Sequence, residues 1–163
     1  MSDIWFDKVD GPYGWLGNMA PYPVLHLGRR WLTTEALFQA LRFGDEDLRM
    51  LICAEKSPMG AKMMAKKHAE AMVVAPMTAQ DLEHMRLCVG LKLEQHKQLQ
   101  GRLLATGEAV IREDVTKRNG ARHEFWGTRR LPDGGIRGHN WLGTIWMERR
   151  DVLRSSGMSI RVL

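Results

Sequence analysis

Two pairs of polar side chains stand at helical spacing and carry groups that can act as acids, bases or nucleophiles. Glu35 and Gln39 are one helical turn apart, and so are Lys62 and Lys66. Glu35 falls in the first turn of its predicted helix, where the helix dipole favours the ionised carboxylate. Each pair also has a purely structural interpretation. Glu35 is a good N-terminal helix residue, and the lysines fit either a solvated surface or a semi-buried pair that faces a pocket.

A second polar group lies late in the chain. Trp126 is followed by Gly127, which would place an indole face beside backbone that a ligand can approach closely. A tryptophan that fills a small core is an equally good interpretation. Asn140 precedes an apolar helical pattern, so it is a candidate helix cap as well as a candidate ligand group.

Several classes of site have no support in the sequence. The six histidines are scattered, none is part of an HxxxH pattern, and no carboxylate cluster accompanies them. GxSxG, Walker and GxGxxG motifs are absent. Cys53 and Cys88 stand singly within apolar helical patterns, which favours buried thiols over a disulfide or a metal site. We therefore expect no metal.

The elements that must position these side chains are mostly helices. Short strands are predicted over Ile4 to Phe6 and Val24 to Leu27, within a segment rich in Gly, Pro and aromatic residues. Capping residues and the 3.6-residue period then predict successive helices. These run from Thr33 or Thr34 to about Phe43, from Asp45, from Ser57–Pro58 to about Ala71, from Thr78 with Asp81 as its capping partner, and through Leu99 to a stop at Gly107.

The last third of the chain is predicted to be less regular. Residues 113–138 read as a long loop around one short strand near Phe125 and Trp126, and Asn140 would cap a last helix that ends near Leu153. We expect residues 1–153 to form a single domain and residues 154–163 to form a C-terminal tail.

Charge limits the partners without naming one. The 163 residues include 24 Lys and Arg against 19 Asp and Glu, a net charge of +5, with a pI near 9.5 and a mean hydropathy of -0.32. This balance favours anionic partners, either phosphate-bearing small molecules or nucleic acid. No apolar run is long enough for a membrane span, and the N-terminus lacks the pattern of a signal peptide. The sequence thus predicts a cytoplasmic protein with no membrane partner.

Taken together, ordered motifs along nearly the whole chain resemble the NADAR or YbiA-like family. They are YGWLGNM at 13–19, WLTTEALFQALRF at 31–43, AKMMAKK at 61–67, KLEQHKQLQGRLLATG at 92–107, FWG at 125–127 and GHNWLGTIWMERR at 138–150. The resemblance implies a compact, mainly helical α+β domain. It also implies an N-glycosidase that needs no cofactor and cleaves the bond between a phosphorylated ribose and a base or amine.

The resemblance also assigns roles to residues. The catalytic pair would be Glu35 and Lys62. The substrate-binding set would be Gly17, Asn18, Gln39, Lys66, Trp126, Gly127, Asn140 and Gly143. Two motifs depart from the family pattern. In the first, Gly17 and Met19 stand where the family has a serine and an aromatic residue, and in the second, the acidic residue usual a few positions before the WG pair appears as His123 or Glu124.

Such a site has a coherent chemistry. Cleavage of a ribosyl C1–N bond builds positive charge on the sugar, which a carboxylate stabilises, and the departing nitrogen needs a proton. Glu35 can serve either role. Lys62 offers a covalent variant, in which its neutral amine captures C1 of the opened ribose as a Schiff base.

The family is associated with two substrate classes. One is ADP-ribose attached to guanine in nucleic acid or nucleotides, a modification made by DNA-modifying toxins, and the other is aminated ribosylaminopyrimidine phosphates of riboflavin biosynthesis. The basic pI favours the first, with ADP-ribosylated DNA as a partner. A non-catalytic nucleotide or ADP-ribose binding module is the alternative of another class. The sequence does not indicate the oligomeric state.

Overall fold

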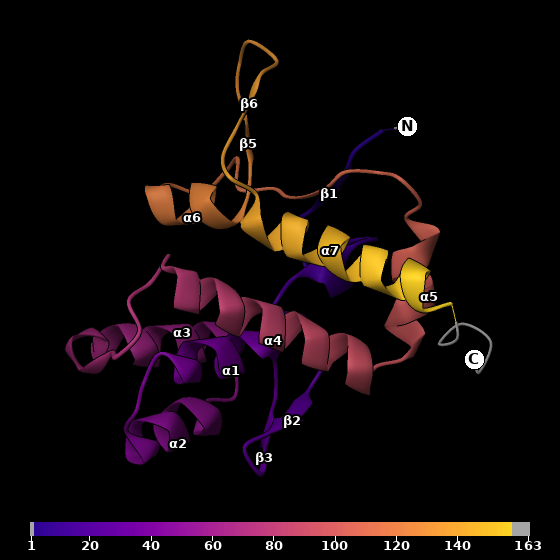
Figure 1. Ribbon diagram of the computed structural model, residues 1–163. Helices are drawn as coiled ribbons and strands as arrows, with labels where there is room; N and C mark the ends of the chain where they lie inside the picture. Colours follow the sequence, from indigo (N-terminus) through magenta and orange to yellow (C-terminus); the bar gives the residue numbers. More distant parts are fainter. Residues whose placement is uncertain (1, 158–163) are drawn as a thin grey trace. The chain divides into compact units, whose positions relative to one another are not determined.

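The computed structural model describes residues 2–157 and shows a mainly helical α+β fold (Figure 1). The chain divides into two compact units. Residues 18–95 form one, called the central unit below. Residues 1–17 together with 96–163 form the other, called the terminal unit. Within the described residues, no helix is both long and apolar enough to cross a membrane.

The central unit is built around one buried helix. That helix is α1 (Thr34–Leu41), every residue of which is buried, and it packs against the other helices and against β3. The remaining elements are the antiparallel strands β2 (Val24–His26) and β3 (Arg29–Trp31), the helices α2 (Glu46–Ala54), α3 (Pro58–Lys67) and α4 (Ala79–Gln95), and the 3₁₀ helix η2 (Ala69–Ala71).

Side-chain caps begin these helices where the sequence predicts them. The hydroxyl or carboxylate oxygens of Thr33, Asp45 and Ser57 each accept a hydrogen bond from the backbone N–H three residues later. The predicted starts are therefore confirmed. Helix α3 ends at Lys67 instead of continuing to Ala71, because the chain tightens there into η2.

A short parallel sheet joins the two chain segments of the terminal unit. Strand β1 (Ile4–Phe6) lies beside β4 (Ile111–Glu113), in a register that places Ile4 opposite Ile111. Helix α7 (Trp141–Ser156) packs against β4, α5 and α6. The other elements are the 3₁₀ helix η1 (Gly14–Leu16), the helices α5 (Gln98–Ala105) and α6 (Ala121–Trp126), and the antiparallel hairpin of β5 (Arg129–Arg130) and β6 (Ile136–Arg137).

One predicted element is wrong in type. The strand expected near Phe125 and Trp126 is instead the end of helix α6. The aromatic residues favour a strand locally, but the Phe125 ring packs edge-on against Trp126, with ring centroids 4.9 Å apart, and lies tilted to the Trp141 ring, with centroids 6.5 Å apart. Tertiary packing thus overrides the local strand preference.

The end of the chain differs modestly from expectation. Helix α7 continues to Ser156, beyond the predicted end near Leu153. The predicted tail therefore begins with residues that are helical, and its positions 158–163 lie outside the described residues.

Candidate functional site

A continuous chain of buried polar side chains runs along α1. The Gln39 side-chain amide donates to Glu35 Oε1 at 2.9 Å, and Arg42 Nη1 donates to Gln39 Oε1 at 3.2 Å. Glu35 is 8% exposed. Both ends of the Gln39 amide are therefore engaged, and Gln39 holds the Glu35 carboxylate in one orientation.

The far end of this chain is an ion pair with α4. Arg42 Nε and Nη2 donate to Asp81 Oδ1 and Oδ2 at 2.9 and 2.8 Å, and the two side chains are 2% and 0% exposed. The sequence predicts that Asp81 completes a capping box with Thr78. Instead its carboxylate accepts from Arg42 and from the backbone N–H of Met77, while Thr78 still accepts from the Asp81 N–H. The charge of Arg42 is thus neutralised by Asp81.

Glu35 itself makes no ion pair with any residue that the structure describes. Its carboxylate accepts from the neutral amide of Gln39. Its backbone N–H donates to the carbonyl of Asn18 at 3.1 Å, which fixes the first turn of α1. The Glu35 carboxyl group is therefore buried and oriented, and its printed side-chain partner is an amide.

Asn18 connects the start of α1 to α4. Its side-chain Oδ1 accepts from Thr34 Oγ1 at 3.0 Å, and its Nδ2 lies 3.0 Å from the sulfur of Met85. Asn18 is 8% exposed. The structure therefore brings Asn18, Glu35 and Gln39 together in the central unit, with Asn18 bound to protein groups at both ends of its amide.

The two predicted site lysines lie on α3 and differ in exposure. Lys62 is half-buried and Lys66 is exposed, and neither forms an ion pair within the part of the chain that the structure describes. Ala61 and Ala65 are the buried residues of α3, which packs against α1. Lys62 therefore stands at the margin of the buried face.

A third lysine, outside the predicted site, is the most deeply buried. Lys92 on α4 is 0% exposed, and its Nζ lies 5.0 Å from the centre of the Tyr22 ring. Burial lowers the pKa of Lys92 from 10.5 to about 7. In the sequence, Lys92 has the helical spacing from Met85 and Cys88 that places all three on one face of α4, and the other two are also buried. This spacing indicates a buried Lys92, but a lysine at such a position usually reaches solvent.

Asn140, a predicted site residue of the terminal unit, contacts the backbone of β4. Asn140 adopts a left-handed backbone conformation (φ 56°) at the start of α7, but its side chain makes no cap bond. Instead Nδ2 donates to the Ile111 carbonyl at 2.8 Å and Oδ1 accepts from the Glu113 N–H at 3.2 Å. The prediction that the Asn140 side chain caps the last helix is therefore wrong, because its amide bonds to the backbone of β4.

The glycines near Asn140 allow close backbone contacts. A Cβ on Gly143 would lie 2.1 Å from the Ile111 carbonyl oxygen, and one on Gly127 would lie 2.7 Å from the Glu113 oxygen. Trp126 is 9% exposed. Gly17 is half-buried, and its N–H donates to the Gly14 carbonyl.

Of the two thiols predicted to be buried, the structure buries Cys88 but leaves Cys53 partly exposed. Both thiols are free. Burial raises the pKa of each thiol. Over residues 2–157, no group of three or more His, Cys, Asp or Glu residues is arranged to hold a metal ion.

Comparison with known proteins gives a consistent result along the chain. The NADAR domain model matches residues 5–154. The N-glycosidase YbiA of Escherichia coli is 34% identical over 151 residues, which cover 92% of this chain and 88% of that protein. A riboflavin biosynthesis protein of Vibrio vulnificus is 29% identical over 152 residues, covering 93% of this chain and 38% of its own length.

A solved structure agrees with the sequence matches. The NMR structure of E. coli YbiA superimposes with a TM-score of 0.78 at 31% identity, covering 97% of this chain and 89% of that one. The α+β fold expected from the motifs is thereby confirmed. The chain belongs to the NADAR domain family.

Proposed function

We propose that this protein is an N-glycosidase that hydrolyses the bond between a phosphorylated ribose and a base, and that its substrate is ADP-ribosylated guanine. The activity class is supported by the relatives named N-glycosidase. The substrate is supported by the excess of basic residues, because a diphosphate and a nucleic acid both carry negative charge.

The proposal rests on one observation, the burial and orientation of the Glu35 carboxylate. This carboxylate is buried, oriented by Gln39 and not neutralised by any described cation. As the C1–N bond breaks, positive charge grows on the ribose ring, and a fixed carboxylate stabilises that charge without reorganising. Arg42, the cation of the same network, is paired with Asp81 and donates to Gln39.

The bond changes are those of a hydrolysis. The C1–N bond breaks, the guanine nitrogen takes a proton, and the oxygen of water bonds to C1, which releases ADP-ribose and guanine. In a covalent variant, the neutral amine of Lys62 bonds to C1 as the C1–N bond to guanine breaks, and the guanine nitrogen takes the proton that the amine loses. The ribose ring then opens so that C1 is held as a Schiff base, and water hydrolyses this to ADP-ribose and the free lysine. Lys62 is the proposed amine, with Lys66 nearer a phosphate.

Lys92 is a second amine to consider in this chemistry. Burial lowers its pKa to about 7, which favours the neutral amine more than in an ordinary lysine. The remaining roles follow the family motifs: Trp126 would stack on a base, and Asn18, Gln39 and Asn140 would contact the substrate.

A riboflavin-pathway intermediate is the second candidate substrate. The relative from Vibrio vulnificus, named a riboflavin biosynthesis protein, favours it. The ribosylaminopyrimidine phosphate also contains a ribosyl C1–N bond, so the same carboxylate chemistry applies.

A direct assay distinguishes these substrates. The protein is incubated separately with an ADP-ribosylated guanine oligonucleotide and with the ribosylaminopyrimidine phosphate, and the products are identified by mass spectrometry. Release of ADP-ribose with restoration of guanine supports the proposal. Turnover of the pyrimidine compound alone would show that it, and not ADP-ribosylated guanine, is the substrate. Tight binding of ADP-ribose without turnover of either compound would indicate a binding module.

A further inference from the structure

The two oxygen atoms of the Glu35 carboxylate have different surroundings. Oε1 accepts a hydrogen bond from Gln39 Nε2 at 2.9 Å. Oε2 accepts none from any residue in the range 2–157 that the structure describes. Because most buried polar atoms in proteins have a partner, an oxygen without one is a place where a group of a ligand fits. The two oxygens can therefore serve different purposes.

Arg42 determines which end of the Gln39 amide faces Glu35. A guanidinium group has hydrogen-bond donors and no acceptor, so only the oxygen of the amide can bind to it. Arg42 Nη1 donates to that oxygen at 3.2 Å, which turns the amide nitrogen toward Glu35. A flipped amide would lose both hydrogen bonds, because its nitrogen would then face another donor.

Asp81 holds Arg42 in turn. Two hydrogen bonds, of 2.9 and 2.8 Å, join Arg42 Nε and Nη2 to the two oxygens of Asp81, so the guanidinium plane cannot rotate without breaking both. The Asp81 carboxylate also accepts from the backbone N–H of Met77. The side chains of Arg42 and Asp81 are 2% and 0% exposed, so little water competes for these bonds. The orientation of the Gln39 amide is therefore set from α4.

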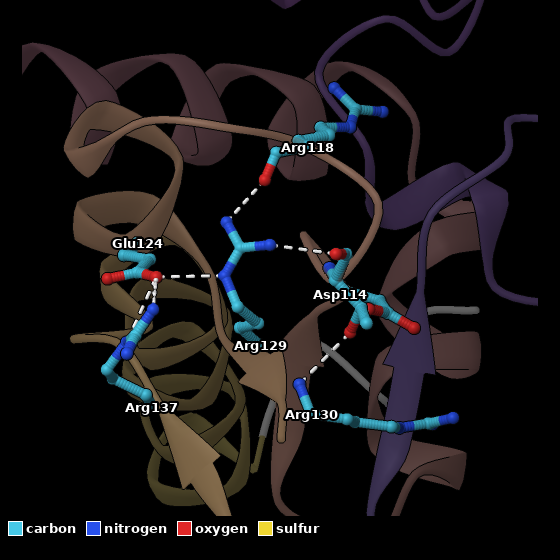
Figure 2. Close-up of polar contacts among 7 residues, drawn as sticks. Asp114, Arg118, Glu124, Arg129, Arg130 and Arg137 are labelled. Carbon is cyan, nitrogen blue, oxygen red and sulfur yellow. Dashed lines mark hydrogen bonds and ion pairs between the residues drawn. The ribbon is translucent and has the colours of Figure 1, made fainter. Parts of the chain in front are cut away.

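A carboxylate of the terminal unit shows the opposite arrangement. Glu124 Oε1 accepts from Arg129 and from Arg137, at 2.8 Å in each case (Figure 2). These hydrogen bonds lower the pKa of Glu124, and two cations compensate its charge within the protein. On α1, by contrast, the neutral amide of Gln39 stands between the guanidinium and the carboxylate. The arginine there orients a carboxylate without bonding to it.

We propose that Arg42 is a positioning residue, which acts through Gln39 to divide the Glu35 carboxylate into an anchored oxygen, Oε1, and a reacting oxygen, Oε2. Oε2 lies against the ribose, where positive charge grows as the C1–N bond breaks, and the fixed amide keeps it there during the reaction. Arg42 itself does not touch the substrate. The inference rests on the proposed function and deepens it, because it names the group that orients the reacting oxygen.

The first test removes the arginine without leaving a buried charge. In Arg42→Met/Asp81→Leu, apolar side chains replace the whole ion pair, a change that buried pairs often tolerate. Circular dichroism checks the fold. We expect kcat on an ADP-ribosylated guanine mononucleotide, or on the pyrimidine compound if the wild type hydrolyses only that one, to fall about tenfold or more, with KM within about twofold of wild type. Arg86→Met/Glu83→Leu, which replaces an exposed ion pair on α4, is the matched control and should leave both constants unchanged.

Two further variants test whether the effect passes through the amide. Gln39→Met removes the amide and keeps the ion pair. If Arg42 acts only through Gln39, adding Arg42→Met/Asp81→Leu to Gln39→Met should lower kcat by no more than about twofold further. Arg42→Lys keeps a cation without acceptors at this position and should retain most of kcat. Decreases in kcat that multiply, or a rise in KM alone in Arg42→Met/Asp81→Leu, would overturn the proposal.

A measurement that needs no activity follows the amide directly. One Nε2 proton of Gln39 is bonded to Glu35 and should exchange slowly with solvent in NMR spectra, where Gln39→Met identifies its signal. We expect exchange to be about tenfold or more faster in Arg42→Met/Asp81→Leu and unchanged in the control. Equal exchange in that variant and in wild type would overturn the proposal. If wild type hydrolyses neither candidate substrate while slow exchange depends on Arg42, the proposed function fails and the positioning of Glu35 by Arg42 stands.

Discussion

Arg42 and Asp81 form a buried ion pair with two hydrogen bonds, which joins α1 to α4 in the central unit. Because Arg42 also donates to Gln39, and Gln39 donates to Glu35, the pair orients a carboxylate two helical turns away from Arg42. A structural ion pair and a candidate catalytic group thus belong to one network.

Removal of the charge from Asp81 should destabilise the protein strongly. In Asp81→Asn the Arg42 guanidinium stays buried without its counter-charge, so we expect the free energy of unfolding to fall by about 3–5 kcal/mol. Urea denaturation measures this change. Glu83→Gln on the same helix removes an exposed pair with Arg86 and should cost less than about 1 kcal/mol. Similar decreases in the two variants would show that the buried ion pair contributes no more to stability than the exposed one.

Glu35→Gln should abolish most of the activity without unfolding the protein. The change keeps the shape of the side chain but removes the charge that would stabilise the ribosyl cation, so we expect the rate to fall by ~100-fold or more. The rate is measured on ADP-ribosylated guanine, with Glu94→Gln, an exposed carboxylate on α4, as the matched control. A near-normal rate in a folded Glu35→Gln variant would remove Glu35 from the mechanism.

Borohydride trapping should identify the reacting amine. If Lys62 captures the ribose carbonyl, reduction in the presence of ADP-ribose leaves a stable adduct on Lys62, which peptide mass spectrometry locates. Lys66 is the internal control on the same helix, and Lys62→Arg should yield no adduct. An adduct on Lys92 would transfer the role to that lysine. Full activity of Lys62→Arg without any adduct would favour direct attack by water.

Lys92→Met should change how stability depends on pH. The pKa of Lys92 is about 7 in the folded protein and near 10.5 when the side chain is in water. Between those values the unfolded chain binds more protons than the folded one, so the free energy of unfolding rises with pH across that window and is flat below it. We expect this slope to disappear in Lys92→Met, with a gain in stability at pH 7. Urea denaturation at pH 7 and pH 9 tests this, and an unchanged slope would contradict it.

Gly143→Ala should destabilise the terminal unit. The new Cβ would lie 2.1 Å from the Ile111 carbonyl oxygen, so α7 must move away from β4, at a cost of about 1–3 kcal/mol or more. Gly101→Ala is the control, because a Cβ at that helical position meets nothing within 4 Å. It should gain about 0.5–1 kcal/mol from helix propensity. Thermal unfolding of both variants measures the difference, and equal melting temperatures would rule out the close approach of α7 to β4.

Local sequence signals were enough to predict where most helices begin and which family the chain resembles. Thr33, Asp45 and Ser57 cap their helices as predicted, because a cap depends on a side chain and a backbone N–H only three residues apart. The proximity of Glu35 and Gln39 was also readable, because one helical turn separates them.

Long-range packing determines which polar groups meet when they are far apart in the sequence. Nothing local pairs Arg42 with Asp81 or Asn140 with the backbone of β4. The same limit explains the missed helix at Phe125, whose aromatic residues favour a strand until neighbouring rings pack around them. Burial of Lys92 has the same origin, because its low pKa arises from desolvation by surrounding residues. Contacts of this kind depend on the packing of the whole unit, which local spacing does not encode.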